Sequence, residues 1–320
     1  MAETLADLRS DPLFGWLTLD DGTRLRTAHW PSFVTPARGT VLLLTGRSEF
    51  VEKYAETAGE LLDRGFEVFA FDWRNQGLSD RPLANPQIHH LDSFDTLADD
   101  LDAVVERVVR PAAGGRPLVL LAHSMGGLVA TLGVARHPDW YRAAIVTAPM
   151  YDIFTGPVPR PLAVWLAEQL CARGRAREYA FGQGDYKPAE GLFTPANPIT
   201  SDARRYAVFH DAFRDRPELR LGGVSFGWVR AALRASEQLL RGLPLDRVTT
   251  PVLLLSAPKD AIVRSDSHRL VAARLPNATL KEYPDAKHEL LMERDAIRDR
   301  VWADIDAFLA TVGLGQRSDD

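Results

Sequence analysis

Three residues of the types used in nucleophilic catalysis, Ser124, Asp260 and His288, each follow a short apolar run in this chain of 320 residues. A serine hydroxyl is a poor nucleophile at neutral pH and needs a base within hydrogen-bond reach. His288 would take the hydroxyl proton and return it to the leaving group, while Asp260 would orient the imidazole and stabilise its charged form. The order Ser, Asp, His therefore predicts covalent catalysis by a serine if the fold brings the three together.

The segment around Ser124 carries the strongest signal. The apolar run Leu118–Ala122 predicts a buried strand, and Met125–Ala135 is apolar at helical spacing. A serine placed between strand and helix without a loop requires a sharp, strained turn with small neighbours two positions away, here Ala122 and Gly126. This pattern predicts a nucleophile, and the alternative is a serine that only caps the helix.

Other histidines compete with His288 for the role of the base. His123 is next to Ser124, but adjacent residues on a sharp turn point apart. His89 and His90 lie in a polar segment and are expected to be solvated, and His268 falls in a predicted helix and is expected at the surface.

Two further aspartates compete with Asp260. Asp72 also follows an apolar run, but the sequence from Asp72 to Gly77 is typical of a turn and predicts a structural ion pair. Asp285 follows Pro284 in a sequence that favours a turn and is too near His288 along the chain to orient it. Asp260 is therefore assigned as the acid.

An oxyanion formed during acyl transfer needs preorganised donors. The backbone N–H of Met125, at the start of the helix after Ser124, is one predicted donor. The backbone N–H of Arg47 is the other, because Thr45 and Gly46 end a further predicted strand and Gly46 allows a close approach. This role does not require the Arg47 side chain.

The elements that must position these residues alternate between strand and helix. After a hairpin over residues 16–29 with a two-residue turn at Asp21 and Gly22, strands are predicted at 40–44, 66–71, 118–122, 143–148, 251–256 and 278–283. Helices are predicted at 51–62, 94–108, 125–135, 266–275 and 295–309. Near-continuous apolar strands alternating with helices predict an α/β fold with a mostly parallel sheet covered on both faces. Ligands gather at the carboxyl ends of such strands, which is where the three catalytic candidates fall.

Residues 151–245 interrupt this alternation. They contain no clear strand and predict helices at 161–173, 202–213 and 226–241. We therefore expect a core of residues 1–150 and 246–320 with a helical cap of residues 151–245 inserted after the sixth strand. The cap contains more large apolar residues than a simple connecting segment needs. Some of them are expected to line a channel for one acyl chain, but the sequence does not identify which.

Composition excludes several functional classes. A net charge of −5 gives no basic footprint for nucleic acid. The single cysteine, Cys171, excludes an intramolecular disulfide, and the cysteine and histidine positions show no zinc-like spacing. Residues 1–9 include acidic residues without a long apolar core, so no secretory signal is expected, and no run of about 18 apolar residues predicts a membrane span. A cytoplasmic location is the expectation.

The chain resembles the α/β-hydrolase superfamily, in particular the lysophospholipase and monoacylglycerol lipase branch that is grouped with a serine aminopeptidase-like family. The matching segments span nearly the whole chain and are residues 44–49, 64–79, 122–127, 197–201, 256–260 and 286–293, together with Tyr54 and Tyr206. The resemblance implies an α/β-hydrolase fold with a cap after the sixth strand. It also implies Ser124, Asp260 and His288 as the triad, Arg47 and Met125 as the oxyanion donors, and no cofactor or metal.

Three positions depart from the pattern of the family. Thr45 replaces a histidine at the oxyanion strand end, Ala122 replaces the first glycine of the turn, and Asn75 replaces the glycine after Arg74. The first two lie at the site but keep the main-chain donors, so they bear on substrate preference more than on activity. Relatives that act on haloalkanes or epoxides use an aspartate nucleophile, which Ser124 argues against.

The leading interpretation is a carboxylic ester hydrolase that acts on lysophospholipid or monoacylglycerol. Transient contact with a membrane surface is left open, and the sequence makes no prediction of oligomeric state. An aminopeptidase is a second interpretation, for which Glu168, Asp185 or Glu190 of the cap could bind the substrate amine. A non-catalytic binding protein on a hydrolase scaffold is a third, from another class, and labelling by a serine-directed fluorophosphonate would exclude it.

Overall fold

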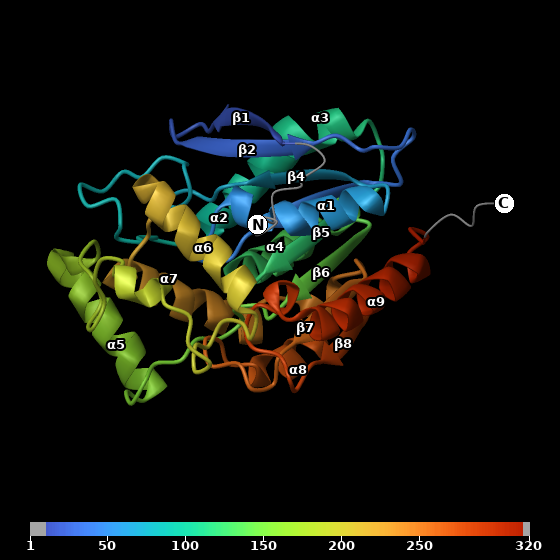
Figure 1. Ribbon diagram of the computed structural model, residues 1–320. Coiled ribbons are helices and arrows are strands. Elements are labelled where there is room, and N and C mark those ends of the chain that lie inside the picture. The colour runs from blue at the N-terminus through green and yellow to red at the C-terminus, as the bar shows by residue number, and fades with distance from the viewer. Residues whose placement is uncertain (1–10, 316–320) are drawn as a thin grey trace.

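The computed structural model describes residues 11–315, so the amino-terminal segment used to exclude a secretory signal lies outside the described residues. Eight strands form one sheet in the order β1-β2-β4-β3-β5-β6-β7-β8 (Figure 1). The strands are β1 Leu13–Thr18, β2 Arg24–Trp30, β3 Thr40–Leu44, β4 Glu67–Phe71, β5 Leu118–His123, β6 Ala143–Thr147, β7 Val252–Ser256 and β8 Ala278–Glu282. The pairs β1–β2 and β2–β4 are antiparallel and all others are parallel, which confirms the mostly parallel sheet predicted from the sequence.

Both faces of the central strands are buried because alternate side chains enter separate apolar clusters. Along β5, Leu118, Leu120 and Ala122 belong to one cluster, and Val119 and Leu121 belong to the other. A strand that is apolar at every position is therefore stable only where helices cover both faces.

Nine α-helices accompany the sheet in the described residues. They are α1 Ala55–Asp63, α2 Phe94–Val104, α3 Arg110–Ala113, α4 Met125–Arg136, α5 Arg160–Leu170, α6 Ala203–Asp215, α7 Phe226–Glu237, α8 Asp266–Ala272 and α9 Asp295–Thr311. Side chains of α1 and α9 join the cluster on one face, and those of α2, α4, α7 and α8 join the cluster on the other. None of these helices is long and apolar enough to cross a bilayer.

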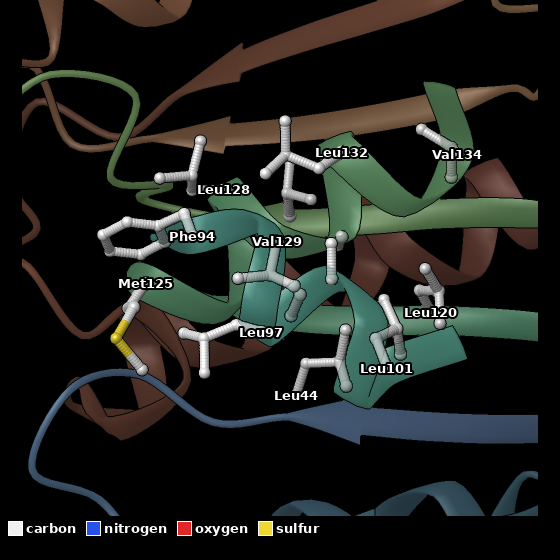
Figure 2. Packing of buried hydrophobic residues seen from close by; sticks show 14 of the residues in the cluster. Leu44, Phe94, Leu97, Leu101, Leu120, Met125, Leu128, Val129, Leu132 and Val134 are labelled. Atoms are coloured by element: carbon white, nitrogen blue, oxygen red, sulfur yellow. The ribbon is translucent and has the colours of Figure 1, made fainter. Parts of the chain in front are cut away.

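Helix α4 is buried along its whole length up to Val134 and packs between the sheet and α2. Figure 2 shows Leu128, Val129 and Leu132 of α4 among Leu97 of α2 and Leu120 of β5. Because α4 begins one residue after Ser124, this packing fixes the position of the serine relative to the sheet.

The segment between β6 and β7 contains α5, α6 and α7, which lie together at one end of the sheet (Figure 1). The buried Arg205 and the partly buried Arg81 connect it to the rest of the chain. Arg205 Nη2 contacts Glu56 Oε1 of α1 at 2.7 Å, and Arg81 donates to the carbonyl oxygens of Leu219 and Arg220. This arrangement matches a helical cap after the sixth strand, while its boundaries at residues 151 and 245 stay a prediction.

The hairpin differs in detail from the prediction. Leu19 N–H donates to the carbonyl of Thr23 over 2.8 Å, so three residues and not two form the turn. Gly22 adopts φ 84°, which is the left-handed conformation that a glycine at the end of a three-residue loop supplies. The turn residues were correctly located, but the sequence did not decide the loop length.

Candidate active site

Ser124 lies at the tip of the turn between β5 and α4. Its backbone adopts φ 50° and ψ −114°, a strained conformation for a residue with a side chain. Its carbonyl oxygen accepts from the N–H groups of Gly127 and Met150, each over 2.9 Å, which holds the turn in place. The Ser124 hydroxyl makes no helix-capping hydrogen bond, so the alternative prediction, a serine that only caps α4, is wrong.

Close backbone contact explains the small residue two positions after the serine. A Cβ on Gly126 would lie 2.5 Å from the carbonyl oxygen of Leu44 and 2.6 Å from that of Thr45. The start of α4 therefore lies directly against the end of β3, and a side chain at position 126 would separate them.

The structure brings the three catalytic candidates together. Ser124 Oγ lies 2.9 Å from His288 Nε2, and His288 Nδ1 lies 2.6 Å from Asp260 Oδ2. All three side chains are buried, with residue exposures of 5 to 7%. Nδ1–H thus donates to the carboxylate, which leaves Nε2 free to accept the serine proton.

Asp260 is held by backbone as well as by His288. Its Oδ1 accepts from Ile262 N–H over 2.7 Å and from Val263 N–H over 3.0 Å. Burial alone would raise the pKa of Asp260, but the contact with His288 and these two backbone donors lower it below the ordinary value. The carboxylate is therefore charged at neutral pH and able to stabilise an imidazolium.

The two candidate oxyanion donors lie at the adjoining ends of α4 and β3. Neither Met125 N–H nor Arg47 N–H has a protein acceptor within residues 11–315. The loop that carries Arg47 is fixed from the other side, because Trp73 Nε1 donates to Thr45 O over 2.9 Å and Gln76 Nε2 donates to Gly46 O over 2.8 Å. Their role as an oxyanion hole stays a prediction.

His123 is buried and turned away from the serine, as expected from its position. Its Nδ1 lies 3.0 Å from Thr147 Oγ1, and its ring centroid lies 4.7 Å from that of His288. Burial lowers the pKa of His123 to about 3, so this imidazole is neutral and packs beside the base.

The expectations for three other histidines were wrong. His89 and His90 are buried and not solvated, because His89 forms a parallel bridge with Val224 of the cap and His90 Nδ1 lies 2.9 Å from Ser225 Oγ. His268 is fully buried and not at the surface. The helix that contains it faces the sheet at this position, which a short apolar pattern could not reveal.

His268 connects two strand ends behind the triad. Its Nδ1 lies 2.7 Å from Ser256 Oγ at the end of β7, and its Nε2 lies 2.8 Å from the carbonyl oxygen of Pro149, after β6. Met150, the next residue, donates to the backbone of Ser124. His268 therefore stabilises the support of the turn without reaching the reacting atoms.

The two rejected aspartates have other partners. Asp72 forms the predicted ion pair, with Arg26 Nη2 at 2.8 Å from Oδ2, and also accepts from the N–H groups of Val51 and Leu78. Asp285 pairs with Arg300 at an exposed position.

A buried ionic cluster beside the triad was not foreseen from the sequence. Lys53 Nζ lies 2.6 Å from Glu49 Oε1 and 2.6 Å from Glu289 Oε1, and Tyr54 Oη donates to Glu49 Oε2 over 2.6 Å. Glu49 also accepts from Gly46 N–H, next to Arg47. Glu49, Glu289 and His123 come close enough to hold a metal ion, but the Lys53 ammonium already contacts one oxygen of each carboxylate. The cluster therefore supports the loop after β3 rather than forming a metal centre.

Two cavities meet at Ser124. One has a volume of about 600 Å³ and is lined by apolar side chains of the cap, among them Leu166, Leu170, Phe226 and Trp228. The other has a volume of about 450 Å³ and is lined by charged and aromatic side chains that include Lys53, Tyr186 and Phe209. Ser124 and Arg47 line both cavities.

The acidic cap residues differ in their access to this site. Asp185 and Glu190 line the polar cavity, whereas Glu168 lies outside the lining of both cavities and contacts Arg234 at 2.7 Å. Only the first two are therefore placed to meet a substrate.

Comparison with known proteins confirms the resemblance. The family model described as "Serine aminopeptidase, S33" matches residues 35–295. The chain is 33% identical over 273 residues to the probable lysophospholipase L2 of Haemophilus influenzae, covering 85% of this chain and 84% of that protein. It is 36% identical over 266 residues to lysophospholipase L2 of Escherichia coli K12, covering 81% and 76%.

A solved structure supports the fold. A soluble variant of monoglyceride lipase from Saccharomyces cerevisiae, crystallised with a substrate analogue, superposes with a TM-score of 0.72 at 21% identity and covers 95% of this chain and 97% of that chain. The α/β-hydrolase fold predicted from the sequence is thereby confirmed. With a family match over most of its length and a triad-like geometry at the expected strand ends, this chain belongs to the serine aminopeptidase S33 family of hydrolases.

Proposed function

We propose that this chain is a serine hydrolase that cleaves the carboxylic ester of a lysophospholipid or a monoacylglycerol through an acyl-enzyme intermediate. The observation that carries the proposal is that Ser124 lines both an apolar and a polar cavity. A single-chain glycerolipid has the same division, with its ester between an acyl chain and a polar alcohol. The names of the relatives in Haemophilus influenzae and Escherichia coli support the same class of substrate.

The proposed mechanism follows from the contacts of the triad. Ser124 Oγ attacks the ester carbonyl carbon while its proton passes to His288 Nε2, 2.9 Å away. The resulting imidazolium is stabilised by Asp260, and the backbone N–H groups of Arg47 and Met125 stabilise the oxyanion. The proton on Nε2 then goes to the departing alcohol, and a water molecule activated by His288 releases the fatty acid.

A series of p-nitrophenyl esters from acetate to palmitate tests the acyl cavity. Each buried methylene contributes about 0.8 kcal/mol, so kcat/KM should rise about fourfold per added methylene until the cavity is full. A flat profile, or a preference for acetate, would contradict an acyl-binding cap.

A pair of variants on one helix localises the effect. Leu166 lines the apolar cavity, whereas Leu162 on the same helix α5 is exposed and outside that lining. Leu166→Phe should shift the preferred acyl chain to a shorter length, and Leu162→Phe should leave the profile unchanged.

An aminopeptidase is the second candidate, because Asp185 and Glu190 line the polar cavity and could bind a substrate ammonium. Parallel assays on monoacylglycerol, lysophosphatidylcholine and aminoacyl-anilides separate the two functions. Faster turnover of the anilides than of both lipids would favour the peptidase.

Transient binding to a lipid surface is part of the proposal. Phe154 and Phe181 line the apolar cavity yet are 53% and 67% exposed, and Trp165 on α5 is 56% exposed. Trp165→Glu should weaken sedimentation with phosphatidylethanolamine vesicles, whereas Leu270→Glu, which changes an exposed leucine of α8, should not. Cell fractionation would test the expected cytoplasmic location.

A further inference from the structure

The polar cavity is lined by two cations that have no ion-pair partner in the described residues, and one of the two also lines the apolar cavity. Four basic side chains line this cavity: Arg47, Lys53, Lys187 and Arg205. Lys53 is balanced by Glu49 and Glu289, and Arg205 contacts Glu56, Asp202 and Asp295. These two are therefore committed to ion pairs.

Lys187 has no carboxylate within 4.0 Å of its Nζ in the described part of the chain, and the hydrogen bond that it donates, to Glu190 Oε1, comes from its backbone N–H. Its side chain is exposed to solvent, and it lines the polar cavity but not the apolar one. Lys187 therefore does not share the position of Ser124, which lines both cavities.

Arg47 differs from Lys53 and Arg205 because it has no ion pair in the part of the chain that the structure describes, and from Lys187 because it lines both cavities. Its Nη1 donates to the carbonyl oxygen of Gly222 over 3.0 Å, and no other protein acceptor or carboxylate partner of its side chain occurs within residues 11–315. A guanidinium has five N–H donors in a fixed fork that matches carboxylate and phosphate oxygens. The hydrogen bond to Gly222 thus orients the fork while most of its donors stay available.

Position and charge define what Arg47 could bind. Arg47 and Ser124 each line both cavities, and the Arg47 guanidinium contacts Gly222, which lines the polar one. Arg47 therefore borders the place where the alcohol part of an ester must leave. Burial lowers the pKa of Arg47 to about 10, against the opposing charges of Glu190 and Glu49, so the side chain stays cationic at neutral pH. An anion attached to the leaving alcohol would meet it.

We propose that the Arg47 guanidinium binds the phosphate of a lysophospholipid headgroup and makes this site prefer phosphate-bearing glycerolipids over neutral monoacylglycerols. The inference rests on the proposed function and narrows its substrate class. Arg47 is a specificity-determining residue in this scheme through its side chain, in addition to the role proposed for its backbone N–H.

The test compares two substrates with the same acyl chain, octanoyl-glycerophosphoethanolamine and octanoylglycerol, both below the concentrations at which they form micelles. The measured quantity is the ratio of their kcat/KM values within one preparation. Any loss caused by partial unfolding or by disturbance of the oxyanion donor affects both substrates and cancels in the ratio.

The wild-type protein should favour the phosphate-bearing substrate, and Arg47→Gln should lower the ratio about 10- to 100-fold, the range expected for loss of a charge-assisted hydrogen bond. Arg47→Lys keeps the charge but loses the fork and should give an intermediate ratio. Arg173→Gln removes an exposed cap arginine outside both cavities and should leave the ratio within twofold.

Product inhibition gives a second, independent readout. Glycerophosphoethanolamine should compete with p-nitrophenyl octanoate in the wild-type protein, and its inhibition constant should rise at least 10-fold in Arg47→Gln. An unchanged substrate ratio in Arg47→Gln would overturn the phosphate assignment while leaving ester hydrolysis in place. Absence of hydrolysis of every ester by the wild-type protein would instead overturn the proposed function itself.

Discussion

Two buried polar regions lie side by side at the carboxyl edge of the sheet, and they use charge differently. The reacting region is defined as the three candidate catalytic residues Ser124, Asp260 and His288, and the ionic region as Arg26, Glu49, Lys53, Asp72 and Glu289. His123 lies between them, with its ring 4.7 Å from that of His288 and its Nε2 4.0 Å from Glu49 Oε1.

In the ionic region, each carboxylate has a permanent cation as partner, Lys53 for Glu49 and Glu289 and Arg26 for Asp72. In the reacting region, Asp260 has two backbone N–H donors and a histidine. A permanent ion pair fixes structure, whereas a carboxylate facing a histidine can stabilise a charge that appears only during reaction. The two regions should therefore respond oppositely to mutation.

The largest expected effect is that of Ser124→Ala in the reacting region. Turnover should fall by about 10⁶-fold, because triad members act as a unit, and labelling by a fluorophosphonate should be lost. Ser93 caps α2 through a hydrogen bond from Asp95 N–H, so Ser93→Ala is the matched control. It should cost about 1 kcal/mol of stability and leave turnover per folded molecule intact. Near wild-type hydrolysis by Ser124→Ala would refute the assignment of the nucleophile.

Asp260→Asn should come next. An amide at this position favours the wrong imidazole tautomer, so kcat should fall by about 10⁴-fold by analogy with other triads. The amide oxygen of the asparagine can still accept hydrogen bonds from the backbone N–H groups of Ile262 and Val263, so the melting temperature should change little. Kinetics and differential scanning calorimetry on the same preparation measure both quantities.

Asp72→Asn should show the reverse behaviour. This change removes one partner of a buried ion pair. The charge of Arg26 is then compensated by Glu52 alone, which contacts it at 2.6 Å. We expect a loss of about 3 kcal/mol in the free energy of unfolding, measured with urea, and a kcat per folded molecule within a few-fold of wild type. A large loss of kcat with unchanged stability would mean that the roles of Asp72 and Asp260 were exchanged.

The smallest expected effect is a change in acid sensitivity. Burial alone would raise the pKa of Glu49. The charge of Lys53, the charge that His123 gains when it is protonated in acid, and the hydrogen bonds from Lys53 and Tyr54 instead lower this pKa from 4.5 to about 2. A carboxyl group whose pKa is lowered on folding stabilises the protein above its unfolded pKa and loses that contribution as the pH falls through the folded pKa.

Between pH 4.5 and 2, ionised Glu49 should therefore make the free energy of unfolding of the wild-type protein fall by up to about 1.4 kcal/mol per pH unit. Glu49→Gln has no carboxyl group to titrate at this position. The difference in free energy of unfolding between wild type and variant should therefore become smaller as the pH falls. Glu289, whose pKa is raised by burial, contributes with the opposite sign in both proteins. A gap that is constant with pH would show that Glu49 does not ionise in the folded protein as described.

Local sequence patterns determined most of the sheet. The apolar run before Ser124 is β5, the small residues beside it allow the turn, and the order of strands and helices predicts the α/β fold. These features depend on residues that are close together in the sequence, so a short stretch of sequence is sufficient to predict them. The same holds for the position of Ser124, Asp260 and His288 after strands, from which their meeting could be inferred because parallel strands share one carboxyl edge.

Only the tertiary structure decided which polar residues are buried together. His89, His90 and His268 were expected in solvent and are covered by the cap or face the sheet. The ion pair between Lys53 and Glu289 joins residues 236 positions apart, and the side chain of Arg47 gained significance only when the fold placed this residue at both cavities without a carboxylate partner among the described residues. Burial and pairing depend on segments that are remote in the sequence, and a pattern of apolar spacing contains no information on which remote charge will lie opposite.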